Sequence, residues 1–425
     1  MNRKIIAFLF LISIIFAGCA TTTVQDEPII AKDLIAPARG EDNSNIAAVA
    51  KGANDFAFRL SSALVKNAEN ANFICSPFSV WLPLAALSNA IDKKNKPELL
   101  DALGAAGQSV DDVNNAASRM LYDLTNADNR RTDNNPLKIA NAVFVDKKET
   151  LKLPFAQTFA DYFRGNFQKV DFSSRKAVDA VNKWASDNTD GLIQNIIENF
   201  NEDTVAAIAN AIYFSDRWAW EFNPGDTKED AFHSPEGDSR AFYMSRDSEK
   251  QVYYEDEKLQ AISMNFKTNG GLYILLPKEE SAVEILTSMT SGYFDEIING
   301  GDYAEGKLLL PRFEIESGAV QLKDSLTALG IPLFDAENPV INGLIENDPL
   351  FISSAVQKSV INVDEKGTTA AAVTVIAMDV GAALAPEPEQ VPFEMICDKP
   401  FVFILYGETY DGGRQVLFTG VVNQP

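Results

Sequence analysis

Residues Asn362–Met378 read NVDEKGTTAAAVTVIAM. Asp364–Gly367 is a turn signal, and the eleven residues that follow, Thr368 to Met378, contain no charge, proline or glycine. Successive side chains of a strand point to opposite faces, so one face of this run is uniformly small or apolar and can lie on a core. That face consists of Thr368, Ala370, Ala372, Thr374, Ile376 and Met378.

A loop-like segment follows this run directly, because Gly381, Pro386, Pro388 and Pro392 interrupt any regular pattern. A strand-competent stretch beside such a segment is consistent with two states, one exposed and one inserted in a sheet. From the pattern alone, an ordinary buried strand is the simpler interpretation.

The surrounding residues resemble those of the serpin family. Glu365-Lys366-Gly367-Thr368 followed by alanines is similar to the reactive-loop hinge of serpins, and Asp398–Phe403 and Gly420–Val422 are similar to their C-terminal strands. The resemblance extends from about Ile46 to Val422, and its motifs occur in the family's order. The other similar motifs are Asn72–Val80, Asn210–Phe214 with Trp218 and Phe222, Leu310–Phe313 and Leu329–Ile331.

This resemblance implies an α+β serpin fold, in which helices pack on a large central sheet, further sheets are present and a reactive loop is exposed. Residues 46–425 then form one domain. The implied function is suicide-substrate inhibition of an endopeptidase, without enzymatic turnover of its own. The protease forms an acyl-enzyme with the loop, and the cut loop inserts as a new strand, a known form of strand addition to a sheet.

The resemblance also assigns two groups of residues. Gln357 stands where the family commonly has histidine, and its amide can both donate and accept hydrogen bonds. Glu365 is expected to pair with Arg312, with Trp218 packed nearby. The hinge group is Glu365, Gly367, Thr368, Ala370, Ala371 and Ala372, and the group that controls opening of the sheet is Ser76, Ser79, Asn210, Trp218, Arg312 and Gln357.

By analogy with inhibitory serpins, the bond cleaved by the protease is expected sixteen positions after Glu365, between Gly381 and Ala382. The loop is longer than in many serpins, so the expected range is Met378–Leu384. No lysine or arginine occurs from Thr368 through Asp398, which argues against trypsin-like targets. The small residues Val380, Gly381, Ala382 and Ala383 around the expected bond favour elastase-like serine proteases, whose substrate pockets are small. The alternatives are papain-like cysteine proteases, or a serpin-fold binding protein without inhibition.

The first residues form a separate kind of segment. A basic patch, Arg3-Lys4, precedes the apolar run Ile5–Phe16, which is too short to span a bilayer comfortably, and Ala17-Gly18-Cys19 follows. This resembles a bacterial lipoprotein signal covering residues 1–18, with Cys19 lipidated and residues 19–45 forming a flexible tether. The expected location is membrane-anchored outside the cytoplasm, on the outer-membrane, periplasmic or cell-surface side. A plain cleaved signal peptide and secretion are the alternative.

Composition limits the partners and the chemistry. The net charge of −23, or −25 without Arg3 and Lys4, disfavours nucleic acid, and the stretch 111–123 is not basic, so no heparin-type activator is expected. The single histidine, His233, leaves little room for Ser–His or Cys–His catalysis. No cysteine or histidine cluster indicates a metal site, no cofactor is implied, and we expect a monomer. Cys75 and Cys397 are expected to be buried thiols, although a disulfide between them is possible.

Hydrophobic periodicity predicts mixed helices and strands. The predicted helices are Ala48–Lys66, Ser79–Ala90, Lys96–Leu103 and Ala177–Asn188. The predicted strands are Ile139–Val145, Ala206–Phe214, Gln260–Phe266, Leu272–Leu276, Lys307–Ile315, Phe401–Tyr406 and Gln415–Val422.

Overall fold

The computed structural model describes residues 44–68, 70–126, 137–200, 204–346, 349–368, 392–409 and 412–425. Within these ranges helices lie mainly in the first half and strands dominate the second, as in α+β proteins. The helices are α1 (Ser44–Val65), α2 (Pro77–Leu87), α3 (Lys96–Ala102), α4 (Val110–Asn126), α5 (Leu153–Phe163), α6 (Arg175–Asn188), α7 (Ala282–Ser288), α8 (Ser291–Gly300) and α9 (Lys323–Ala328), with a 3-10 turn η1 at Pro224–Asp226.

The largest hydrogen-bonded sheet has nine strands, in the order β1-β18-β17-β9-β8-β7-β10-β16, with β6 paired to β7. Most of its strands come from the second half of the chain. They are β1 (Phe73–Cys75), β6 (Lys228–Ser234), β7 (Gly237–Glu255), β8 (Leu259–Asn265), β9 (Gly271–Pro277), β10 (Asp302–Pro311), β16 (Phe393–Ile396), β17 (Phe401–Glu408) and β18 (Arg414–Val422).

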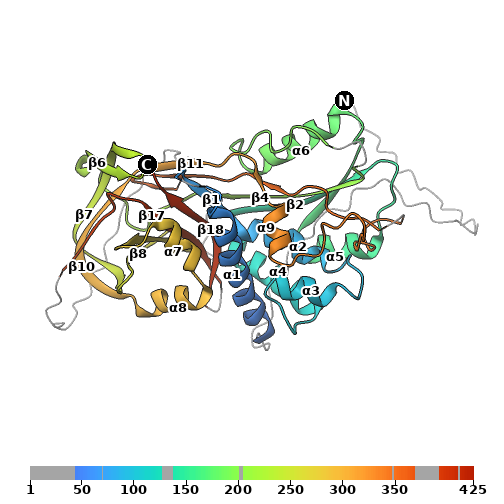
Figure 1. Cartoon of the computed structure of the whole chain (residues 1–425), viewed down its shortest axis with the longest axis horizontal. Coiled ribbons are helices and arrows are strands. Elements are labelled where there is room, and N and C mark those ends of the chain that lie inside the picture. The colour runs from blue at the N-terminus through green and yellow to red at the C-terminus, as the bar shows by residue number, and fades with distance from the viewer. Residues whose placement is uncertain are drawn as a thin grey trace, which may run out of the picture.

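Two smaller sheets contain most of the remaining strands. One has the order β3-β2-β4 and the other β11-β14-β15-β5, while β12 pairs with β13. In Figure 1, β2 and β4 run along the long axis, with α6 on one side of them and α2 on the other. These strands are β2 (Leu137–Asp146), β3 (Gly165–Val170), β4 (Ala206–Phe214), β5 (Asp216–Arg217), β11 (Phe313–Glu316), β12 (Val320–Gln321), β13 (Val356–Gln357), β14 (Val360–Val363) and β15 (Gly367–Thr368).

The large central sheet implied by the resemblance is therefore divided in two. At one end β5 continues from β4 and pairs with β15, which pairs with β14 on its other side. Below that junction, in the part of the chain that the structure describes, β4 pairs only with β2 and β13 only with β12. A strand position between β4 and β13 is left open.

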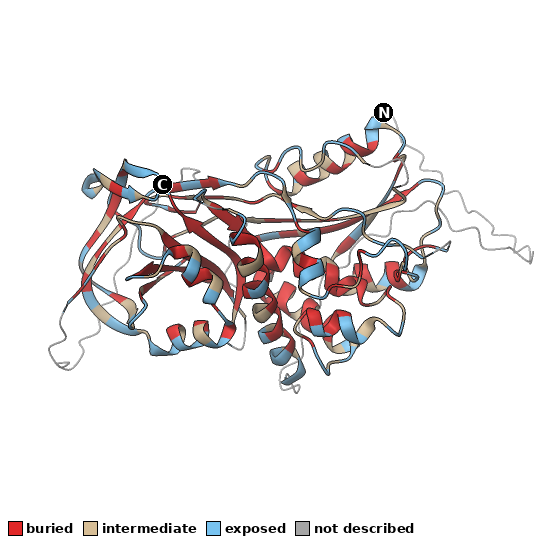
Figure 2. Cartoon of the chain, in the orientation of Figure 1, coloured by how far each residue is buried: buried red, intermediate tan, exposed pale blue. Residues whose placement is uncertain are grey.

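The core comprises a large cluster and a small one. The large cluster joins α1, α2 and α4 to the nine-stranded sheet, and Figure 2 shows these elements buried on their facing sides. The small cluster joins the outer face of β2 and β4 to α6 through Phe144, Ala209 and Val181. Both faces of β4 are thus occupied along most of its length.

The predicted helices and most predicted strands are present, with shifts at their ends. The predicted strand Lys307–Ile315 is divided at Arg312 into β10 and β11, which belong to different sheets. α1 begins at Ser44, so it includes the last two residues of the predicted tether. Among the elements that were not predicted are α5, α7, α8, α9 and the long β7, which carries several charges and shows no clean alternation.

A close contact between α1 and the end of α3 depends on two glycines. Gly104 has φ +78°, and a Cβ there would lie 2.2 Å from the carbonyl oxygen of Gly52. A Cβ on Gly52 would meet the backbone of Gly104 at 1.9 Å. Neither position accepts a side chain without moving a helix.

Cys75 and Cys397 are buried thiols that are not joined in a disulfide. Burial raises the pKa of Cys75 to about 11, which keeps it protonated. None of the helices in the described ranges is both long and apolar enough to cross a membrane. Cys19 and the leader lie outside the described residues.

Candidate functional site

The first hinge residues occupy a strand position between two neighbours. Thr368 pairs with Val363 of β14 on one side and with Asp216 of β5 on the other, both antiparallel. Its side chain is only 1% exposed, as the uncharged inward face predicts. β15 lies between β14 and β5, in line with the open position between β13 and β4. Ala370, Ala371, Ala372, Gly381 and Ala382 lie outside the described residues.

Gly367 is required by this arrangement. Its φ is +154°, and a Cβ there would lie 2.0 Å from the carbonyl oxygen of Asp216. The backbone of β15 therefore approaches β5 more closely than any side-chain-bearing residue allows.

Glu365 is fastened immediately before the hinge. Its Oε1 accepts hydrogen bonds from Arg312 Nε at 2.8 Å and Nη2 at 2.5 Å, and from Thr227 Oγ1 at 2.5 Å. Glu365 is 5% exposed, whereas the Arg312 side chain is 44% exposed. Burial opposes ionisation of Glu365, but the bonds from Arg312 and Thr227 outweigh it, and its pKa lies below the ordinary 4.5.

Trp218 holds the backbone of the same turn. Its amide donates to the carbonyl of Lys366 and its Nε1 donates to the carbonyl of Asp364, both at 2.8 Å. The indole is buried and stacks on Phe266 with ring centroids 4.8 Å apart. The turn before the hinge is thus held in two ways. Arg312 and Thr227 bind the Glu365 side chain, and Trp218 binds the carbonyl groups of Asp364 and Lys366.

Gln357 joins β13 to the start of α2. Its Oε1 accepts from the amide of Ser76 at 3.0 Å, and its Nε2 donates to Ser76 O and Ser79 Oγ, each at 2.7 Å. Ser76 Oγ in turn donates to Leu417 O at 2.8 Å. Gln357 therefore bonds to two of the predicted control residues, Ser76 and Ser79, without a group that titrates near neutral pH.

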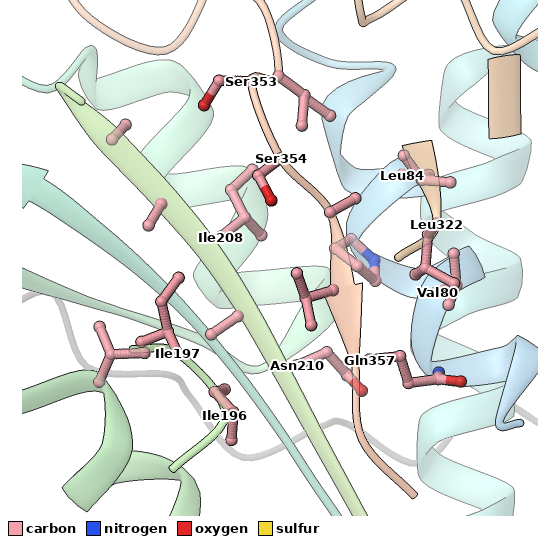
Figure 3. A pocket seen from close by; sticks show the side chains of 18 of the residues that line it. Val80, Leu84, Ile196, Ile197, Ile208, Asn210, Leu322, Ser353, Ser354 and Gln357 are labelled. Atoms are coloured by element: carbon pink, nitrogen blue, oxygen red, sulfur yellow. The ribbon is translucent and has the colours of Figure 1, made fainter. Parts of the chain in front are cut away.

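Asn210 does not join this network. Its Nδ2 donates to Asn141 Oδ1 at 2.7 Å, and its Oδ1 is buried with no hydrogen-bond partner among the described residues. Figure 3 shows Asn210 extending from β4 toward the segment that carries Gln357, while Gln357 points away to α2. An unpaired acceptor therefore faces the open strand position.

A cavity of about 400 Å³ occupies that position. One side is β4 from Ala206 to Ile212, and the other is the segment Phe351–Lys358. α2 supplies its floor, and apolar residues between α6 and β4, among them Ile196, Ile197 and Phe200, supply its roof. Ser79, Asn210 and Gln357 all line it, so three of the predicted control residues meet there.

The comparisons with known proteins agree with this geometry. Residues 51–425 match the family described as Serpin (serine protease inhibitor). The chain belongs to the serpin family. An uncharacterized serpin-like protein of Methanosarcina acetivorans is 30% identical, with 89% of this chain and 86% of that protein covered. Antichymotrypsin-2 of Bombyx mori is also 30% identical, with 89% and 99% covered.

Solved structures show the same fold. The thermophilic serpin tengpin in its native state matches with a TM-score of 0.76 at 23% identity, covering 92% of this chain and 96% of that one. Serpins in general inhibit proteases and are not enzymes, and protease-inhibitor names among the relatives support a protease as partner of this serpin.

Several residues of the site were missed at the level of sequence. Asp216, Thr227 and Asn141 make their contacts through loops or across strands, and no spacing in the sequence marks them. The apolar residues Ile193, Ile196, Ile197 and Phe200 follow the i, i+3, i+4, i+7 spacing of an amphipathic helix, although the structure has no helix there. That spacing is the signal that could have marked this segment as packed against the rest of the molecule.

We expect Arg312→Ala to lower the free energy of unfolding by about 2 kcal/mol, because it leaves the buried Glu365 carboxylate without its cation. The ion pair contributes stability above pH 4.5, and this contribution is lost as the pH falls through the lower folded pKa. The variant should therefore lose less stability than the parent between neutral and acidic pH. Denaturant unfolding measured across that range tests this.

The matched control is Arg240→Ala, which removes an exposed ion pair with Glu229 at 3.6 Å. Its effect should stay below about 0.5 kcal/mol. Equal effects of the two substitutions would show that the Glu365 contact does not stabilise this serpin specifically.

Proposed function

We propose that this serpin is a suicide inhibitor of an endopeptidase and that the loop after Thr368 inserts between β4 and β13 once it is cut. One observation carries the proposal: Gly367 and Thr368 already form strand β15, aligned with an open strand position. Insertion gives the facing edges of β4 and β13 ladder partners and buries the inward face of the loop. It thereby displaces the acylated protease before the ester hydrolyses.

The register of β15 predicts where each loop residue arrives. Thr368 lies opposite Asp216 and Val363, and antiparallel pairing moves one step back on each neighbour for each step forward on the loop. On the inward face, Ala370 then arrives between Phe214 and Ile361, Ala372 between Ile212 and Ser359, and Thr374 between Asn210 and Gln357.

This register gives Thr374 a particular role. It is the first polar residue on the inward face after Thr368, and it arrives beside Asn210, whose Oδ1 is buried and unpaired in the described structure. A threonine hydroxyl can donate one hydrogen bond and accept others. The bond to Asn210 would exist only after insertion, so it favours the inserted state alone.

Thr368→Arg should convert the inhibitor into a substrate. Its position is 1% exposed, and an unpaired guanidinium there costs several kcal/mol, enough to stall insertion while cleavage continues. The yield of SDS-stable covalent complex should fall and cleaved serpin should accumulate. Thr369→Arg, on the opposite face of the strand, is the control, and an unchanged complex yield from Thr368→Arg would refute the hinge assignment.

Cleavage of the loop should raise resistance to unfolding, because the new strand completes the sheet. Thr374→Val should reduce this gain by about 1–2 kcal/mol, since Asn210 Oδ1 stays unpaired in the cleaved form. The uncut variant should unfold like the parent. Denaturant unfolding of cut and uncut protein measures both quantities. If cleavage gives the parent no gain at all, the non-inhibitory alternative is favoured.

The proposed target class is elastase-like serine proteases, with cleavage at Gly381–Ala382. Support comes from the small residues Val380 to Ala383 and from the absence of lysine and arginine between Thr368 and Asp398. Papain-like cysteine proteases are the second candidate, because Val380, the residue before Gly381, suits them. We propose no nucleic acid, heparin or metal as partner, and a monomeric inhibitor.

Incubation with a protease panel tests the function and the target class together. Elastase-like enzymes should form SDS-stable complexes, and the released C-terminal fragment should begin within Met378–Leu384, at Ala382 if the register count holds. Mass spectrometry of that fragment identifies the bond. A cut elsewhere, or complexes only with trypsin-like enzymes, would contradict the proposed specificity.

We also propose that Cys19 is lipidated and tethers the serpin to a membrane outside the cytoplasm. The basic patch, the short apolar run and the Ala17-Gly18-Cys19 ending support this. Cys19→Ser should move the protein out of the membrane fraction or block its processing. Normal fractionation of that variant with membranes would exclude the anchor.

A further inference from the structure

β5 is the outer neighbour of the seated hinge, and it consists of two residues only. Gly367 pairs with Arg217, and Thr368 pairs with Asp216. The amide of Asp216 also lies 3.4 Å from Thr368 Oγ1, to which it donates. A two-residue strand has little stability of its own, so something outside the sheet has to hold it in place.

The Asp216 side chain supplies such a fastening. Its Oδ2 accepts from the amides of Thr268 at 2.9 Å and Asn269 at 3.4 Å, and its Oδ1 accepts from Thr268 Oγ1 at 3.2 Å and from the amide of Arg217 at 2.8 Å. Thr268 and Asn269 belong to the turn between β8 and β9. Asp216 thus bonds through its carboxylate to a turn of the nine-stranded sheet and pairs through its backbone with the hinge.

We propose that Asp216 is a positioning residue for inhibition: its carboxylate holds β5 as the template on which Gly367 and Thr368 stay seated. The inference rests on the proposed inhibitory function. A hinge that is already seated serves as the nucleus from which the remaining loop residues pair in turn. Because inhibition is a race between insertion and hydrolysis of the ester, a loosened template slows insertion without changing how readily the loop is attacked.

A carboxylate suits this position better than an amide. All four groups that approach the Asp216 oxygens are donors, and an ionised carboxylate only accepts hydrogen bonds. Asparagine would turn its own amide donor toward the backbone N–H groups of Thr268 and Asn269. Burial raises the pKa of Asp216, and the four donors oppose that rise.

The test compares Asp216→Asn with the matched control Asp256→Asn. Asp256 is also a part-buried carboxylate that accepts from two turn amides, those of Lys258 and Leu259, at 2.7 and 2.9 Å. It lies in the turn between β7 and β8, and the hydrogen bonds that its side chain accepts in the described structure come from that turn and from Tyr254 and Tyr293, not from β5 or β15. Both variants disturb a turn, but only one disturbs β5.

The first measurement is amide hydrogen exchange of the uncut protein. Asp216→Asn should increase exchange at Thr368 at least tenfold, whereas Asp256→Asn should leave that amide as in the parent. The second is the yield of SDS-stable complex with the best protease of the panel, which should fall several-fold for Asp216→Asn alone, at an unchanged rate of loop attack.

Unchanged exchange at the hinge in Asp216→Asn would overturn the positioning role, and faster exchange with an undiminished complex yield would overturn its link to inhibition. If the parent itself forms no complex with any protease, the proposed function fails. The exchange measurement still decides whether the carboxylate seats the hinge, so the two failures are distinguishable.

Discussion

Two strand edges that face each other without hydrogen bonds are the constraint on which this structure depends. Within the described residues, β4 and the segment Phe351–Lys358 border a cavity where a sheet would normally have a strand. Unpaired backbone edges are ordinarily paired or covered in proteins. Here a cavity of about 400 Å³ lies between the two edges, and β15 is already aligned with the vacant strand position. The functional geometry follows from that incomplete sheet.

Polar contacts hold the incomplete sheet in register. Arg312 and Thr227 secure Glu365 on the β14 side, Asp216 secures the β5 side, and Gln357 ties β13 to α2. Hydrogen bonds of this kind require a defined geometry, whereas apolar packing tolerates sliding. The contacts therefore fix the strands that border the gap, and in the described part of the chain no ladder bond joins β4 to β13.

The sequence predicted much of this because the decisive signals are local. Glu365, Gly367 and Thr368 lie together in one motif, and the alternation after them marks the inward face. Phe401–Tyr406 is a continuous apolar run and Ala206–Phe214 is one apart from Asn210, which made these strands recognisable. Gln357 was singled out because it stands where the family commonly has histidine, and its side chain bonds to Ser76 and Ser79.

The rest depended on contacts between distant segments. Asn210 was grouped with Gln357, yet it bonds to Asn141 and leaves its own oxygen unpaired, which only the positions of β2 and β4 determine. The division of the central sheet and the split of Lys307–Ile315 at Arg312 likewise arise from how strands meet in space. Asp216 acts through a turn more than fifty residues away, and no periodicity marks such a pairing.

The seating of Thr368 also constrains how this loop can change in evolution. Its partners are fixed in the uncut protein, so in the proposed insertion the position of every later residue in the sheet follows from its distance from Thr368 along the chain. Deleting or adding one residue shortly after Thr368 would turn all following side chains to the opposite face. Length changes beyond the cleaved bond carry no such penalty. Homologous loops should therefore keep a constant spacing from the hinge to Thr374 and vary in length only nearer to Pro400.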